Sequence, residues 1–98
     1  MSTAEIIAKL KALRVRLEQE GVEHLAIFGS RARGDHSETS DLDLLIDTAP
    51  KSRFSILNLV GVEHIVADST GLPANAFMRR SLDAQFVNSI SADVIEIL

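Results

Sequence analysis

The polar connection between two short hydrophobic segments constrains this chain more than any other feature. The first segment, VEHLAIF, runs from Val22 to Phe28 between two glycines, and the second, DLDLLID, runs from Asp41 to Asp47. Short runs of branched apolar residues with such boundaries predict β-strands. The residues between them, GSRARGDHSETS, are almost entirely polar. Folding alone does not explain why carboxylates stand where this connection leads into a buried strand.

Helices and further strands are predicted on both sides of this unit. Ser2 and Glu5 have capping-box spacing, and leucine and isoleucine then recur at helical intervals. Apolar residues also fall on one arc of a later helix, namely Phe54, Leu57, Val60 and Ile65. The predicted elements are a helix over 3–20, strands over 22–28 and 41–47, a helix over 52–70, a strand over 74–78, a helix capped by Ser81, and a short edge strand near the end. This order predicts an α+β fold, a small mixed sheet with helices packed on it, formed by one domain over residues 1–98.

Composition excludes several classes of function. The formal net charge is −4 and only 4 residues are aromatic, so neither a basic phosphate-binding surface nor a stacking platform is expected, and direct binding of nucleic acid is not predicted. The chain has no cysteine, which removes disulfides and thiolate chemistry. Without a signal peptide or a long apolar run at the amino end, we expect a soluble cytoplasmic protein that does not enter a membrane.

The pair Asp41 and Asp43 predicts a metal site. Side chains alternate along a strand, so both carboxylates point to one face, about 7 Å apart along the chain, while Leu42 and Leu44 point to the other. Two neighbouring carboxylates repel each other, and burial increases that cost. Mg²⁺ removes the conflict, because it prefers oxygen ligands and is held by one or two carboxylates together with phosphates and water.

The dipeptide Gly29-Ser30 supplies the phosphate half of such a site. Glycine lets the backbone approach a ligand closely, and Ser30 can begin a short helix and donate its hydroxyl. Arg31 and Arg33 follow, and each can hold a phosphate or the carboxylate of a partner. Gly-Ser alone is an ordinary turn, and Asp-x-Asp alone is commonly a solvated strand face. Joined by one loop, they predict a site for a nucleotide and a metal.

The motif FGSRARGDHSETSDLDLLID resembles that of the minimal nucleotidyltransferases of the polymerase-β type, and the similarity extends through FSILNLVGVEHIVADSTG and RRSL. The resemblance implies a polymerase-β palm-like fold. It implies that Gly29, Ser30 and Arg33 bind the triphosphate of ATP, and that Asp41 and Asp43 hold two Mg²⁺ ions. Many such proteins are similar to antitoxins that act with a small helical partner of HEPN type, and some transfer AMP to a tyrosine of that partner.

The sequence departs from this family at the third carboxylate, which belongs to a later strand. The matching position in LPANAFMRRSL is Asn75, a neutral amide that can ligate a cation but cannot act as a base. Asp68, Asp83 and Asp93 are the other acids considered for this role, and Asp93 fits best. The sequence thus supports three hypotheses: an adenylyltransferase slowed by Asn75, a degenerate member that neutralises its partner by binding, or a regulatory nucleotide-binding module.

Overall fold

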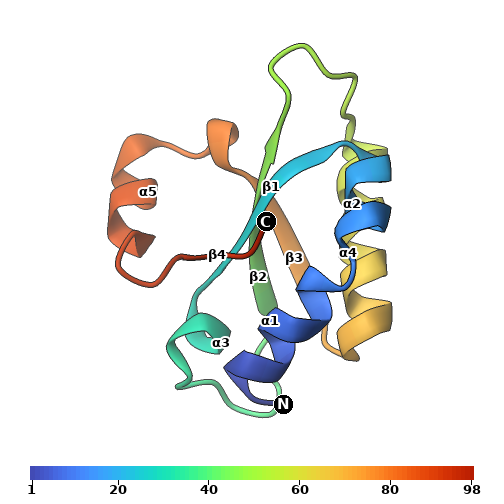
Figure 1. Ribbon diagram of the computed structural model, residues 1–98. Coiled ribbons are helices and arrows are strands. Elements are labelled where there is room, and N and C mark those ends of the chain that lie inside the picture. Colours follow the sequence, from blue (N-terminus) through green and yellow to red (C-terminus); the bar gives the residue numbers. More distant parts are fainter.

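The strands lie between two unequal groups of helices (Figure 1). The structure is a computed structural model that describes residues 1–98. Its elements, in chain order, are α1 (Thr3–Lys11), α2 (Arg14–Glu20), β1 (Val22–Phe28), α3 (Ser30–Arg33), β2 (Leu42–Thr48), α4 (Ile56–Thr70), β3 (Ala74–Met78), the 3₁₀ turn η1 (Arg79–Ser81), α5 (Ala84–Ile90) and β4 (Ile95–Glu96). No helix among them combines the length and the apolar character that crossing a membrane requires.

The four strands form one mixed sheet in the order β3-β2-β1-β4. β1 pairs antiparallel with both β2 and β4, whereas β2 and β3 run parallel. The parallel pair is possible because α4 carries the chain back along the sheet between β2 and β3, as a crossover helix does. The predicted fold class, a small mixed sheet with helices packed on it, is therefore confirmed.

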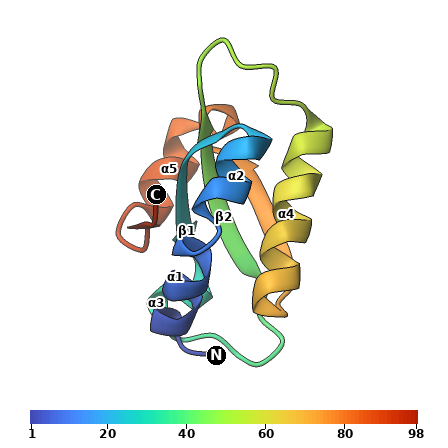
Figure 2. The ribbon, with the colours of Figure 1, turned by 45° about the vertical axis from the view of Figure 1, so that its right-hand side comes forward.

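The alternation of side chains divides the sheet into two faces. Leu42, Leu44 and Ile46 of β2 are fully buried on the face that α1, α2 and α4 cover. On the other face Leu45 packs with Ala26 and Phe28 in a smaller cluster, and α5 lies over this side (Figure 2). Asp43 has the same parity as Leu45, so its carboxylate lies on the smaller, more open side of the sheet.

The first predicted helix is two helices. α1 begins at the predicted capping box of Ser2 and Glu5, and the predicted apolar positions Ile6 and Leu10 are buried, as are Leu13 and Leu17 of the next turns. The chain tightens after Lys11, where the N–H of Leu13 donates to the carbonyl of Leu10 at 3.0 Å, three residues back instead of four. No proline or glycine marks this break, so the continuous apolar spacing concealed it.

Several predicted boundaries shift in the structure. β2 begins one residue later than predicted, which leaves Asp41 just before the strand. α4 begins at Ile56 instead of residue 52. Of its predicted apolar arc, Phe54 and Ile65 pack against the core, but Leu57 and Val60 are 80% and 38% exposed. Val62 and Val66 are the fully buried positions. The last helix is capped by Asp83, which accepts from the N–H of Phe86 at 2.8 Å, and not by Ser81.

Candidate active site

Strand register brings the predicted site residues Asp41, Asp43 and Asn75 together. Asn75 of β3 lies opposite Asp43 of β2 in the parallel pair. Its amide nitrogen donates to Oδ2 of Asp41 at 3.0 Å and lies 3.5 Å from Oδ1 of Asp43. The amide therefore bridges the two carboxylates, and its N–H groups partly offset the repulsion between them.

The surroundings of this group of side chains change the pKa of Asp43. Partial burial raises the pKa of the Asp43 carboxyl above its ordinary value of 3.8, and the nearby charge of Asp41 raises that pKa further. The hydrogen bond from Asn75 acts in the opposite direction, because it stabilises the ionised form. Ionisation of the Asp43 carboxyl therefore carries a cost that a bound cation would remove.

Gly29 follows the last residue of β1 and lies against the Asp43 side chain. Its backbone has φ +78° and ψ −160°, a region that essentially only glycine adopts. A Cβ atom at this position would lie 2.7 Å from Oδ2 of Asp43, closer than real Cβ atoms come to other atoms. The backbone of Gly29 therefore approaches the Asp43 side chain closely, and its approach to a phosphate stays a prediction.

Arg31 has a role that the sequence did not indicate. The predicted helix start at Ser30 is confirmed by α3, but the Arg31 side chain that follows is only 2% exposed. Its Nε and Nη2 atoms each donate to the carbonyl of Ser40 at 3.1 Å, and Nη2 also reaches the carbonyl of Glu38 at 3.3 Å. Arg31 therefore holds the loop that leads into Asp41, and it is not an exposed phosphate ligand.

The same loop is fixed from two other directions. The hydroxyl of Thr3 donates to the carbonyl of Arg31 at 2.7 Å, which ties α1 to α3. The hydroxyl of Ser40 accepts from the N–H of Ser37 at 3.0 Å in the turn before Asp41. Asp41 is thus delivered to the end of β2 by a loop with its own hydrogen bonds.

Arg33 already has two carboxylate partners. Its Nε lies 3.0 Å from Oδ2 of Asp35, and its Nη1 lies 3.1 Å from Oδ2 of Asp93. The hydrogen bond to Asp35 first, and then that to Asp93, raises the pKa of the guanidinium. A triphosphate would have to compete with both acids for Arg33. The pairing also explains why Asp93, the strongest alternative for the missing third acid, does not join Asp41 and Asp43.

The oxygen ligands that this site offers are the carboxylates of Asp41 and Asp43, because Asn75 turns its amide nitrogen towards them. No group of three or more histidine or acidic side chains in the chain is arranged to hold a metal ion. Asp47 points to the same face as Asp43, but it pairs with Arg79 at 3.1 Å near the far end of β2. Asp41 and Asp43 therefore supply the neighbouring oxygens, and carboxylate oxygens are ligands that Mg²⁺ prefers.

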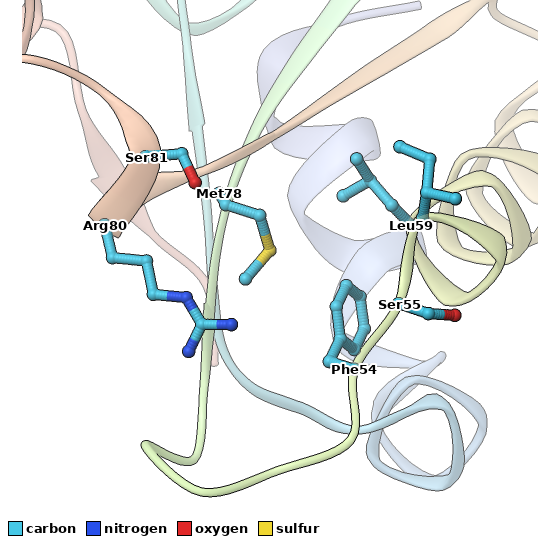
Figure 3. Close-up of a pocket in the computed structure, with 7 residues that line it drawn as sticks. Phe54, Ser55, Leu59, Met78, Arg80 and Ser81 are labelled. Carbon is cyan, nitrogen blue, oxygen red and sulfur yellow. The ribbon is translucent and has the colours of Figure 1, made fainter.

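A separate pocket lies on the other side of β3, away from the carboxylates. Figure 3 shows Met78 and Arg80 on one side of it and Phe54 and Leu59 on the other. Met78 packs with the larger core, whereas Asn75 has the opposite parity along the strand. This pocket is therefore distinct from the carboxylate site, and the sequence did not single it out.

The fold and this site define the class to which the protein belongs. Residues 8–95 match the family model for the nucleotidyltransferase domain. The solved structure of a candidate minimal nucleotidyltransferase shares the fold, with a TM-score of 0.80 over 97% of this chain and 95% of that one, at 23% identity. The chain belongs to the nucleotidyltransferase domain family.

Relatives at higher identity extend over nearly the same length. A candidate protein adenylyltransferase of Methanocaldococcus jannaschii is 36% identical over 94 residues, which are 95% of this chain and 92% of that protein. The protein adenylyltransferase MntA of Thermococcus cleftensis is 30% identical over 90 residues, covering 92% of this chain and 86% of that protein. A crystal structure of a toxin–antitoxin with AMP-PNP has the same fold, with a TM-score of 0.70 over 90% of this chain and 72% of that chain, at 13% identity.

Replacing Gly29 with alanine is expected to destabilise the protein by about 2–3 kcal/mol, since alanine is strained in this backbone region and its Cβ would displace Asp43. Gly71→Ala is the matched control, because Gly71 also has a positive φ, +73°, but no atom lies within 4 Å of its added Cβ. The control should lose only about 1–2 kcal/mol. Urea denaturation measures both variants, and equal losses would contradict the contact with Asp43.

Asp43→Asn is expected to stabilise the protein at pH 7 in the absence of divalent cations. The pKa of Asp43 is raised on folding, so its ionised form costs stability above that pKa, and the cost disappears as pH falls towards 3.8, the unfolded value. The advantage of the variant should therefore shrink on acidification. Thermal unfolding from pH 7 to pH 3.5, compared with the exposed control Asp68→Asn, measures it. An advantage that grows at acid pH would contradict the assignment.

Proposed function

We propose that this protein is a Mg²⁺-dependent adenylyltransferase that transfers AMP from ATP to a helical HEPN-type partner protein, and that it acts as a cytoplasmic antitoxin. The observation that carries the proposal is the meeting of Asp41, Asp43 and Asn75 beside Gly29 at one end of the sheet. Relatives named as protein adenylyltransferases, similar over nearly their full length, support the nature of the acceptor.

Asp41 and Asp43 would hold Mg²⁺, with two ions in a competent site, and the amide oxygen of Asn75 could complete the set after rotation of the side chain. Bound Mg²⁺ would neutralise the carboxylates and polarise phosphate oxygens. Gly29 and Ser30 bind the triphosphate in this proposal, through close backbone approach and the Ser30 hydroxyl. Arg33 contributes once phosphate replaces one of its two carboxylate partners.

In the proposed reaction the oxygen of an acceptor hydroxyl forms a bond to the α-phosphorus of ATP. The bond between that phosphorus and the bridging oxygen to the β-phosphate breaks, and pyrophosphate leaves with the electron pair. The hydroxyl proton passes to water, because the neutral amide of Asn75 cannot accept it. Transfer is therefore slower than it would be with a carboxylate at this position.

The acceptor that suits this site is a tyrosine of another protein. A phenol has a pKa near 10, far below the 15.7 of bulk water, so it needs less help from a base than an ordinary hydroxyl does. The absence of a third carboxylate is least harmful for such an acceptor. The chain itself contains no tyrosine, so the modified residue must belong to a partner.

A second candidate function is neutralisation of the partner by binding alone. The observation that favours it is the Asn75 amide, which bridges the carboxylates at 3.0 and 3.5 Å and leaves only two acids to hold metal ions. A regulatory nucleotide-binding module is a variant of the same idea, in which ATP binds and is not consumed. The two candidates differ in whether the partner becomes covalently modified.

The first experiment isolates the chain from its host with its bound partner and measures the intact mass of that partner. We expect the mass of one or more added adenylyl groups. The modification should disappear in the double variant Asp41→Asn with Asp43→Asn and persist in the control Asp68→Asn, whose side chain is exposed on α4. A partner that stays unmodified with the wild-type chain, yet is neutralised equally by the double variant, would overturn catalysis in favour of binding.

Asn75→Asp is expected to raise the transfer rate by on the order of 10²-fold, the lower end of what a positioned acid–base group contributes. The third carboxylate should also lower stability without divalent cations and make Mg²⁺ more stabilising. The matched control is Asn88→Asp, an identical change at an exposed position of α5. Radiolabel transfer from α-labelled ATP and thermal unfolding with and without Mg²⁺ are the measurements; no rate gain with metal and partner present would contradict the role of Asn75.

A further inference from the structure

Three of the four aromatic residues of the chain gather beside the carboxylate site. The ring centroids of Phe28 and Phe77 lie 5.8 Å apart with the planes tilted by 59°, and those of Phe28 and Phe86 lie 6.2 Å apart in an edge-to-face arrangement at 86°. These residues come from β1, β3 and α5, which are separated in sequence and meet only in the fold.

Register places this aromatic cluster directly next to the proposed reacting groups. Phe28 lies opposite Asp43 in the antiparallel pair of β1 and β2. Phe77 follows Asn75 by two residues on β3, so the two side chains share one face of the sheet, about 7 Å apart along the strand. The ring of Phe77 is thus a near neighbour of the amide that replaces the third carboxylate.

The three rings differ in exposure. Phe28 is 5% exposed and is held between the other two, whereas Phe77 is 36% and Phe86 39% exposed. Phe28 therefore acts as a buried support, and Phe77, two residues after Asn75 on the same face of β3, keeps about a third of its surface exposed.

The order of the strands indicates which reacting group, the acceptor or the leaving phosphates, would lie nearest Phe77. Gly29 follows β1, Asp43 belongs to the adjacent β2, and Asn75 belongs to β3 on the far side of β2. If Gly29 and Ser30 hold the leaving phosphates, as the proposed function requires, an acceptor in line with the leaving group approaches from the opposite side. That side is β3, where Phe77 stands.

We propose that the open part of the Phe77 ring, fixed from behind by Phe28, contacts the aromatic ring of the acceptor and makes the site select tyrosine over serine. This inference rests on the proposed function and adds to it the residue that determines acceptor specificity. An edge-to-face or offset pair of rings contributes beyond the area that it buries, so the preference depends on an aromatic side chain at this position.

The test compares transfer of AMP to N-acetyl-tyrosinamide and to N-acetyl-serinamide, with ATP and Mg²⁺, in the wild-type chain and in Asn75→Asp. Phe77→Leu should lower kcat/KM for the tyrosine compound about 2- to 12-fold, the range that one aromatic pair contributes, and leave the serine compound and the KM for ATP unchanged. Phe54→Leu is the matched control, since Phe54 packs against the larger core away from the carboxylates.

A binding measurement keeps the inference separate from the proposed function. The chain has neither tyrosine nor tryptophan, so the fluorescence of N-acetyl-tyrosinamide can be followed directly in the presence of Mg²⁺ and a non-hydrolysable ATP analogue. Weaker binding to Phe77→Leu than to wild type and Phe54→Leu would support the contact even if no transfer occurred, an outcome that would count against catalysis alone.

Two results would overturn the inference while leaving the transferase intact. One is transfer with the same preference for tyrosine over serine in Phe77→Leu as in wild type. The other is a raised KM for ATP in Phe77→Leu, which would mean that the ring contacts the nucleobase. Absence of N-acetyl-tyrosinamide binding to the wild-type complex would also overturn it. Unfolding curves of Phe77→Leu serve to exclude a loss that reflects only stability.

Discussion

The register of the three central strands is the constraint on which the site depends. Phe28 faces Asp43 across an antiparallel pair, and Asp43 faces Asn75 across a parallel pair. A slip of one residue in β2 would turn Asp43 into the larger core and Leu44 out of it, which the burial of Leu44 forbids. The packing that stabilises the sheet and the position of the carboxylates are therefore specified by the same alternation.

Within this frame the site is a compromise between function and stability. Partial burial and the charge of Asp41 both disfavour ionised Asp43, and the amide of Asn75 relieves part of that cost. A carboxylate at position 75 would add a third negative charge to the same space. Asparagine at position 75 therefore favours the stability of the protein without ligands, whereas aspartate would favour the rate of the proposed transfer reaction.

Much of the site could be predicted because its determinants are local in sequence. Asp41 and Asp43 follow from strand alternation, and Gly29 from the need for close backbone approach. The gathering of Phe28, Phe77 and Phe86 could not be predicted, because it arises from packing between distant elements. Buried Arg31 and exposed Arg33 could not be distinguished from the sequence, because both lie in one short polar helix. Only the path of the following loop determines which of the two side chains is enclosed.

The buried guanidinium of Arg31 has a consequence for the thermodynamics of ligand binding. A polar loop of this length would ordinarily lose conformational entropy when a ligand orders it, and that loss would weaken affinity. Here Arg31 fixes the carbonyls of Glu38 and Ser40 before any ligand arrives. The entropy cost of ordering the loop is therefore part of the free energy of folding. Little of that cost remains to weaken the binding of a ligand at this end of the sheet.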